Sequence, residues 1–499
     1  MKIEDFRGKR VTVMGIGLHG GGVGVINFFY QAGAKVLATD LRSRRELRES
    51  LDALRNFNGI RYMLGQHREE DFKNTDLVIK NPAVSDDSKF LKIARNHGVP
   101  IETDIGIFFE LCPAQIIGVT GSRGKSTTAA LIYQFLKPKH TDTVLAGNIR
   151  MSVLEKLAQI KKTTLVVLEL SSWQLNGLSK HQKSPQVAVM TNIMPDHQNR
   201  YASMEDYLED KKTIYKFQKP GEFLVLNFDD QVLKPLAGEA KSRTYYFSQN
   251  AQGIAELEKM PQTNQEVRIG AHLADKSIFF GASKEKITDL SDIKLAGKHN
   301  LSNTLAAVTV AKLFNVPSRT IKKVLQEFSG LQGRHELIKE INDVKYINDT
   351  TSTIPEATIA AINTLTNHLP PNTKRLILIA GGADKNLDFT QLAEILPGRA
   401  KAVLLLDGTA TPKLEQAIKK AMLTAKPVLL PVKKGRAKTA IPKLTLRKFN
   451  NMASAVSAAR HLAKAGDIVL LSPGCASFGM FRHEFERGEA FNEAVNKLV

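Results

Sequence analysis

The chain has almost none of the residues on which disulfide-rich or membrane-embedded proteins depend. Only two of its 499 residues are cysteine, Cys112 and Cys475, so one chain can assemble neither a disulfide framework nor a thiolate metal site. It contains a single tryptophan, and it has no run of about 18 apolar residues. The N-terminus lacks the apolar core of a secretion signal. We therefore expect a cytoplasmic protein without integral membrane contact.

Acidic residues are scarce relative to basic ones. The chain carries 50 Asp and Glu against 70 Lys and Arg, which gives a formal net charge of +20. Such an excess favours anionic partners such as nucleotides, phosphorylated substrates, nucleic acid or a membrane surface. The densest basic stretch, residues 433–448, holds seven Lys and Arg without interleaved aromatic residues. This composition favours a solvated loop over a nucleic-acid site, and we expect no nucleic-acid partner.

The length and the hydrophobic pattern predict an α/β protein with three domains, the first and third of them Rossmann-like. We assign residues 1–112 to the first domain, 113–331 to a central domain with a parallel sheet, and 332–499 to the third. In the first domain, an apolar strand leads into a turn containing Gly15 and Gly17, and a second strand ends at Asp40. This spacing is typical of a Rossmann nucleotide site.

Shorter strand-like pieces occur late in the central domain, over residues 243–247, 266–269 and 277–280. They predict an antiparallel patch beside the central sheet. Apolar runs at 375–380, 402–406 and 467–471 predict buried strands in the third domain.

The strongest single motif is a phosphate loop, because residues 118–128 read GVTGSRGKSTT. A strand-like run precedes the loop and a helix-like run over 125–136 follows it, which is the context that a phosphate loop requires. Backbone N–H groups at the start of the helix can bind phosphate oxygens. Lys125 would reach the terminal phosphates and Ser126 would ligate Mg²⁺. The expected contacts with ATP in this loop are Gly121, Ser122, Arg123, Gly124, Lys125, Ser126 and Thr127.

Two later segments place polar side chains beside this loop. Glu169 ends an apolar strand, and a carboxylate buried there is suited to a cation such as Mg²⁺. His197 follows the strand expected at 187–191. A helix after Ser203 then places Lys211 on the same face as Tyr207, while Lys212 points away. An inward lysine near a metal needs a partner or a lowered pKa, and a neutral amine can react with CO₂ to give a carbamate.

The combined motifs resemble the Mur ligases, which add amino acids to UDP-N-acetylmuramoyl precursors of peptidoglycan. The resemblance covers essentially the whole chain. After the Gly15 turn it rests, in order, on TGSRGKST, LELSSWQL, DHQNRY with Lys211, GKHNLSNTLAA, GRHE, INDTTST, GGADK and LSPGCASF. Among these ligases the motifs are most similar to those of the glutamate-adding enzymes.

The resemblance implies an ATP-dependent amide ligase that adds glutamate, the D isomer, to UDP-N-acetylmuramoyl-L-alanine by way of an acyl phosphate. Its implied cofactors are ATP and two Mg²⁺ ions, and we expect a monomer. The implied metal ligands are Ser126, Glu169, His197 and carbamylated Lys211, and the implied catalytic residues are Lys125, His197 and Lys211. The further implied ATP contacts are Asn300, Asn303, Arg334 and Asp349. The implied contacts with the acceptor or the amino acid are Gly15, Gly17, Asp40, Asn148, Ser171, Gln174, Lys385, Ser477 and Phe478.

Three departures from the family pattern concern the added amino acid. Thr351 occupies the place of a lysine, Ile354 that of an asparagine, and Gly479 that of an aspartate. Loss of a fixed cation weakens the binding of a dicarboxylate, because a hydrogen bond to a charged group contributes about 1.5–3 kcal/mol. L-Glutamate or another amino acid therefore stays open as a substrate. A phosphate-loop ATPase that binds nucleic acid and a dinucleotide-dependent oxidoreductase are the alternatives from other classes.

Overall fold

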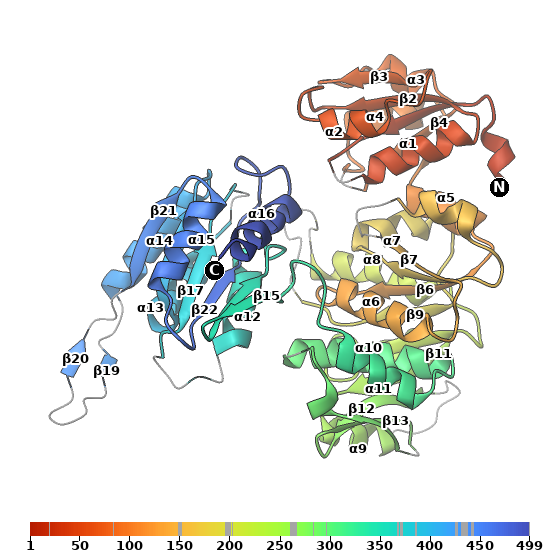
Figure 1. The fold of residues 1–499 in the computed structure, drawn as a ribbon. Coiled ribbons are helices and arrows are strands. Elements are labelled where there is room, and N and C mark those ends of the chain that lie inside the picture. Colours follow the sequence, from red (N-terminus) through yellow and green to blue (C-terminus); the bar gives the residue numbers. More distant parts are fainter. Residues whose placement is uncertain are drawn as a thin grey trace. The chain divides into compact units, whose positions relative to one another are not determined.

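The computed structural model describes residues 1–499 except 19, 83, 148–151, 195–200, 202, 260–266, 283, 296, 367–368, 370–372, 385–386, 425–427, 431–437, 441–443 and 499. The chain forms two compact units, Met1–Phe328 and Ser329–Val499. Three large sheets occur, two in the first unit and one in the second (Figure 1). The predicted α/β class with three domains is confirmed, whereas the boundaries at 112 and 331 stay predictions. No helix in the described ranges is long and apolar enough to cross a membrane.

The first sheet is entirely parallel and has the order β3-β2-β1-β4-β5. Its strands are β1 (Arg10–Met14), β2 (Lys35–Asp40), β3 (Arg61–Leu64), β4 (Leu77–Lys80) and β5 (Ile101–Glu102). Its helices are α1 (Gly21–Gln31), α2 (Arg48–Ala53), α3 (Glu70–Lys73) and α4 (Lys89–Asn96). After β1, the chain adds β2 and β3 on one side of β1 and then β4 and β5 on the other, so β1 and β4 flank a topological switch point. Proteins of the α/β class bind ligands at the carboxyl ends of the strands that flank such a point.

The second sheet has nine strands in the order β14-β13-β12-β11-β10-β9-β6-β8-β7. They are β6 (Gln115–Thr120), β7 (Thr143–Gly147), β8 (Leu165–Glu169), β9 (Val187–Met190), β10 (Phe223–Asn227), β11 (Arg243–Ser248), β12 (Val267–Ala274), β13 (Ser277–Phe280) and β14 (Glu285–Asp289). The helices of this region are α5 (Asp104–Leu111), α6 (Lys125–Leu136), α7 (Ser172–Ser179), α8 (Met204–Lys216), α9 (Ala251–Lys259), α10 (Lys298–Leu313) and α11 (Ser318–Glu327). In this sheet the topological switch point lies between β6 and β9.

The predicted antiparallel patch is only partly right. β11 pairs in parallel with both β10 and β12, whereas β13 pairs antiparallel with its neighbours β12 and β14. These strands extend the central sheet instead of forming a separate patch. The reason is that α9 connects β11 to β12, and a helical crossover returns the chain in the same direction.

The third sheet, in the second unit, has the order β15-β16-β22-β17-β18-β21. Its strands are β15 (Glu336–Ile341), β16 (Val344–Asn348), β17 (Leu376–Ala380), β18 (Ala400–Leu406), β21 (Thr445–Phe449) and β22 (Ile468–Leu471). Alternate residues of β17 face opposite cores: Leu376 and Leu378 pack with α12 (Pro355–Thr366), α13 (Thr390–Arg399) and α14 (Thr411–Thr424). Ile377 and Ile379 pack with α15 (Met452–Leu462) and α16 (Glu484–Asn496). Burial on both faces explains the continuous apolar run.

The prediction of a loop over 433–448 is wrong for part of that stretch. β20 (Lys438–Ala440) forms a hairpin with β19 (Val428–Leu430), and β21 is an edge strand that pairs in parallel with β18. An edge strand has one solvent-facing side, so β21 can carry exposed basic residues such as Lys448 without burying their charge.

A histidine in the first unit connects the end of β5 to the last turn of α5. The ring nitrogens of His181, which follows α7, lie 2.9 Å from Glu102 Oε2 and 3.1 Å from Glu110 Oε1. Lys180 and Lys183 pair with the same two carboxylates. The hydrogen bond to Glu102 is the largest influence on His181 and raises its pKa, although burial opposes it.

We predict that His181 stabilises the first unit more at low pH than at high pH. A raised folded-state pKa gives stability that is fully present below the unfolded value of about 6.5 and is lost as the pH rises through the folded value. Relative to His181→Gln, the wild type should gain roughly 1.5 kcal/mol at pH 6 and less at pH 9. Urea unfolding at the two pH values measures this difference. An equal difference at both would contradict the prediction.

Candidate active site

The phosphate loop lies at the carboxyl end of β6, at the topological switch point of the central sheet. Gly121 has φ +147°, and a Cβ atom there would lie 2.0 Å from Thr191 Oγ1. Gly124 has φ +85°, and a Cβ atom there would lie 2.1 Å from Asn303 Oδ1. The loop therefore needs glycine at both positions. Because Gly124 is also the N-cap of α6 and has no side chain, the first backbone N–H groups of the helix can bind an anion.

Two lysine ammonium groups meet at this loop. Lys125 Nζ donates to the carbonyl oxygens of Gly121 and Ser122, both at 3.0 Å. Lys211 Nζ donates to the same Gly121 oxygen at 3.0 Å and lies 3.2 Å from Thr120 Oγ1. The prediction that Lys211 points inward is confirmed, since its exposed fraction is 1%. Two cations beside a helix N-terminus can neutralise developing charge on a phosphoryl group.

The side chain of Ser122 is part of the framework that places Lys211. Its hydroxyl lies 3.0 Å from Tyr207 Oη and accepts a hydrogen bond from Met194 N. Tyr207 precedes Lys211 by one turn of α8, and Lys211 Nζ lies 4.7 Å from the centre of its ring. Ser203 caps this helix, whose start after Ser203 the sequence predicted, by accepting a hydrogen bond from Asp206 N.

The exposed Arg123 is positioned through its backbone. Its N–H donates to Asn192 Oδ1 at 2.8 Å, and its carbonyl oxygen accepts from Asn192 Nδ2 at 3.0 Å. The sequence analysis did not single out Asn192, although its place directly after a buried strand was a signal for it. The first helical turn continues with Ser126, which is half-buried, and Thr127, which is buried.

The oxygen donors around the loop fit a magnesium ion. Glu169 ends β8 opposite Val119 of β6, and its exposed fraction is 2%. Its carboxylate and the Ser126 hydroxyl are the hard oxygen ligands that Mg²⁺ prefers. The described residues contain no cluster of three His, Cys, Asp or Glu that could hold a metal by itself. His197 and Asn148 lie outside the described residues.

Two asparagines of α10 lie behind the phosphate loop. Asn303 approaches Gly124, and its amide group lies 3.4 Å from Asn300 Oδ1. Both are buried. The structure thus brings Asn303 to the loop, while a contact of either residue with adenine stays a prediction.

Ser171 and Gln174 cap the start of α7. The Ser171 hydroxyl accepts from Gln174 N, and Gln174 Oε1 accepts from Ser171 N. This reciprocal pair is a capping box. The structure therefore accounts for both residues as helix caps, and their predicted contact with substrate stays a prediction.

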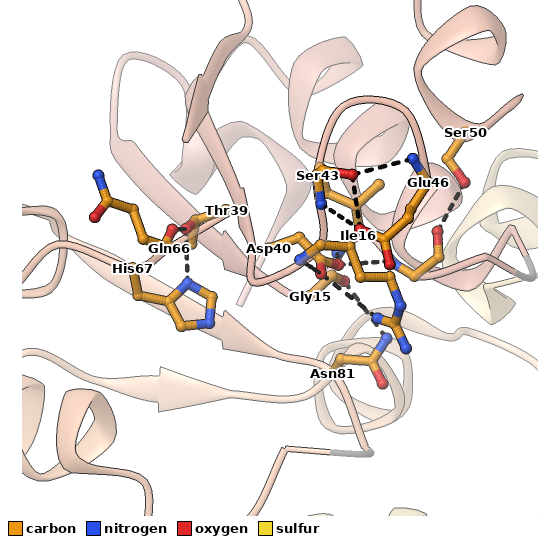
Figure 2. A network of polar contacts seen from close by, with 12 residues as sticks. Gly15, Ile16, Thr39, Asp40, Ser43, Glu46, Ser50, Gln66, His67 and Asn81 are labelled. Carbon is orange, nitrogen blue, oxygen red and sulfur yellow. Dashed lines mark hydrogen bonds and ion pairs between the residues drawn. The ribbon is translucent and has the colours of Figure 1, made fainter. Parts of the chain in front are cut away.

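The glycine turn of the first sheet is organised by Asp40 (Figure 2). Asp40 Oδ2 accepts from Ile16 N at 2.9 Å and from Gly17 N at 3.0 Å. Its other oxygen accepts from Arg42 N at 2.9 Å. Asp40 is buried, with an exposed fraction of 3%. Asp40 thus fixes the glycine turn by accepting hydrogen bonds from the backbone of that turn, and its contact with the acceptor stays a prediction.

Asn81 lies at the carboxyl end of β4, beside the glycine turn that follows β1, and the sequence analysis missed it. It follows β4, and its side chain lies against Gly15, which follows β1 (Figure 2). A Cβ atom on Gly15 would lie 2.8 Å from Asn81 Cβ. Gly15 is therefore required for close approach of the two strand ends, a place where α/β folds bind nucleotides.

The carboxyl ends of β16, β17 and β22 form a comparable edge in the second unit. Asp349 follows β16 and accepts from Ser352 Oγ at 2.5 Å and Ser472 Oγ at 2.8 Å. Burial raises the pKa of Asp349, and the neighbouring His335 acts in the opposite direction. Ala383 N donates to Ala476 O, which ties the loop after β17 to the loop after β22.

The remaining predicted residues of this unit lie on the same edge or outside the described residues. Ser477 is buried and Phe478 is 41% exposed, so the loop after β22 presents an aromatic ring to solvent. Arg334 is exposed in the loop before β15. Lys385 lies outside the described residues. That Arg334 and Asp349 contact ATP stays a prediction.

The phosphate loop of the second sheet, at the start of α6, defines an enzyme that uses a nucleoside triphosphate. Three family models match the chain: the Mur ligase MurD-like N-terminal domain over residues 9–103, the Mur ligase middle domain over 119–311, and the Mur ligase glutamate ligase domain over 333–475. The chain therefore belongs to the Mur ligase family, and it is an ATP-dependent ligase that forms amide bonds.

Curated relatives match over almost their whole length. The UDP-N-acetylmuramoylalanine--D-glutamate ligase of Roseiflexus sp. (strain RS-1) is 43% identical, covering 99% of each chain. The enzyme of the same name from Acetivibrio thermocellus is 36% identical, covering 100% of this chain and 99% of the relative. A solved structure, the UDP-N-acetylmuramate-alanine ligase MurC of Thermotoga maritima, is similar in fold with a TM-score of 0.59. It is 17% identical and covers 98% of this chain and 99% of that one.

Proposed function

We propose that this chain joins D-glutamate to UDP-N-acetylmuramoyl-L-alanine at the expense of ATP, as a cytoplasmic monomer in peptidoglycan synthesis. The observation that supports this most is the meeting of Lys125 and Lys211 at the carbonyl oxygen of Gly121. It places the ends of both side chains where the phosphate loop begins. The printed names of the curated relatives supply the acceptor and the amino acid.

The reaction has two steps, and the described residues serve both by charge and position. First, the acceptor carboxylate attacks the γ-phosphorus of ATP, the bond to the β-phosphate oxygen breaks, and ADP leaves. Next, the amine of glutamate attacks the acyl carbon, loses a proton, and displaces phosphate. Such phosphoryl transfer depends mainly on positioning and electrostatic stabilisation. Lys125 and the N-terminus of α6 would hold the phosphates while the transferred group moves toward the acceptor.

Lys211 is the residue that we assign to the acceptor side of the transferred phosphoryl group. It is buried, and its neighbours Thr120 and Tyr207 fix its direction. In the carbamylated form, the carboxylate on Lys211 would hold two Mg²⁺ ions together with the Ser126 hydroxyl, the Glu169 carboxylate and the His197 imidazole. When bound, these ions would neutralise charge on the phosphates and on the acceptor carboxylate. Glu169 at the end of β8 and Ser126 in the first turn of α6 would hold the ions in place, because both residues lie on regular secondary structure.

The added amino acid would bind in the second unit, at the loops that follow β16, β17 and β22. Lys385, Ser477 and Phe478 are the residues that we assign to it. Thr351, which stands in the place of a lysine, is uncharged, and its hydroxyl donates to Gly333 O at 2.9 Å. Gly479 has φ +105°, a backbone region that residues with a side chain rarely adopt. Lys385 is then the positive charge that would face a dicarboxylate.

Phosphate release with UDP-N-acetylmuramoyl-L-alanine and a panel of D- and L-amino acids tests the proposal. We expect turnover only when ATP, this acceptor and D-glutamate are all present. Faster turnover with L-glutamate or another amino acid would change the substrate assignment. Turnover that does not depend on the acceptor would overturn the proposed reaction.

A further inference from the structure

Arg487 is the largest fully buried side chain among the described residues, and the reaction outlined above does not use it. It lies in the first turn of α16, and its exposed fraction is 1%. No ion pair of Arg487 with a carboxylate occurs in the ranges that the structure describes. A buried guanidinium without such a partner is costly, so its hydrogen bonds deserve a functional explanation.

The Arg487 side chain makes three hydrogen bonds among the described residues, and all of them go to two loops at the carboxyl edge of the third sheet. Nε lies 3.2 Å from Thr350 Oγ1, and Nη2 donates to Thr350 O at 2.9 Å. Nη1 donates to Cys475 O at 3.1 Å. Thr350 is next to Asp349 in the loop after β16, while Cys475 is two residues before Ser477 in the loop after β22. One planar group therefore sets the distance between these loops, which a flexible lysine could not do as rigidly.

The surrounding packing leaves these loops little freedom. A Cβ atom on Gly488 would lie 2.7 Å from Thr350 Cγ2, so α16 touches the first loop closely. The Thr350 hydroxyl also donates to Glu484 O at 2.5 Å. Burial lowers the pKa of Arg487 to about 10, so the group stays charged at neutral pH. The loop after β22, which accepts a hydrogen bond from Arg487 at Cys475 O, also carries the exposed Phe478.

We propose that Arg487 is a positioning residue for the amino-acid pocket: it holds the loops that carry Thr351 and Ser477 at the spacing that an anionic amino acid requires. This inference rests on the proposed function, which assigns Ser477 and Phe478 to the amino acid. It goes further by making the pocket depend on a residue that touches no substrate. A displacement of about 1 Å in such loops is enough to lower the rate by roughly 10²-fold.

Steady-state kinetics of Arg487→Met, Arg487→Lys and Thr350→Val test this role. We expect Arg487→Met to raise the KM for D-glutamate at least about tenfold, while the KM for the UDP-linked acceptor changes less than about twofold. The KM for ATP should rise less than that for D-glutamate, because the same loop carries Asp349. Arg487→Lys keeps the charge and should restore part of the affinity. The matched control is Arg482→Gln. Arg482 is an exposed arginine just before α16, and it forms an ion pair with Glu486. This variant should leave all three KM values unchanged.

Equal rises of all three KM values, or an unchanged KM for the amino acid in a folded Arg487→Met protein, would overturn the inference. If Arg487→Met does not fold, Thr350→Val decides, because it removes the hydroxyl that accepts from Nε with almost no change in shape. It should raise the same KM severalfold, and no rise would overturn the role. A wild type that prefers another amino acid would instead overturn the D-glutamate assignment, and the test of Arg487 would then use that amino acid.

Discussion

Replacement of Lys211 by alanine is expected to abolish amide formation while ATP still binds. Lys211 Nζ is buried and hydrogen-bonded to Thr120 and Gly121, so its loss removes a positioned charge from the phosphate loop. Removal of one such preorganised group costs on the order of 10²–10³ in kcat. Because we propose a carbamate on this lysine, added formate or acetate should restore part of the activity. Phosphate release and ATP titration measure the two effects.

The adjacent Lys212 provides a matched control. It lies on the same helix but forms ion pairs with Glu209 and Glu239 near the surface. Exposed ion pairs contribute at most about 1 kcal/mol, so Lys212→Ala should keep nearly full activity. Full activity of Lys211→Ala would remove the assignment of this lysine to the reaction. A loss that no small carboxylate restores would speak for the unmodified amine.

Replacement of Lys125 by alanine is expected to lower kcat/KM for ATP by roughly 10³-fold. Lys125 begins α6, and its ammonium group lies over the two carbonyl oxygens of the loop, close to where the terminal phosphates would bind. Its charge becomes most valuable when the phosphoryl group transfers, so kcat should fall more than KM rises. Initial rates over a range of ATP concentrations give both values.

Lys137 at the other end of α6 is the control for this second prediction. It is the C-cap of the helix, and its ammonium group lies 5.3 Å from the centre of the Tyr133 ring. A cation there contributes about 0.3–1 kcal/mol through the helix dipole, so Lys137→Ala should affect stability slightly and kinetics hardly at all. Equal kinetic losses in Lys125→Ala and Lys137→Ala would show that the helix, and not the loop charge, is responsible.

The elements around the phosphate loop could be predicted closely because their signals are local. The helix expected at 125–136 is α6, Lys125–Leu136, and the inward face of α8 followed from the spacing of Tyr207 and Lys211. The parallel pairing of β11 could not be read in the same way. Short apolar runs look alike in both directions, and only the crossover helix α9 decides the pairing.

Arg487 illustrates a signal that the sequence contained and that was missed. It shares a face of α16 with Phe491 and Val495 at positions i, i+4 and i+8, and all three are buried. The same reasoning that placed Lys211 inside would have placed Arg487 inside. Its partners, however, come from loops more than a hundred residues apart in the chain, Thr350 and Cys475, and no local pattern connects them.

The sequence by itself determined the chemistry of this protein: the glycines and Lys125 of the phosphate loop, the acid at the end of β8, and the order of motifs that marks an amide-forming ligase. These depend on residues within one or two turns of each other, and short-range geometry dictates what they can bind. Only the tertiary structure decided which groups meet. It brought Lys211 to the carbonyl of Gly121 and Asp40, at the end of β2, to the glycine turn after β1. It also joined Arg487 to two loops that are distant in the chain. Such meetings depend on strand order and on the packing of helices over sheets, which bring together residues that are far apart in the chain.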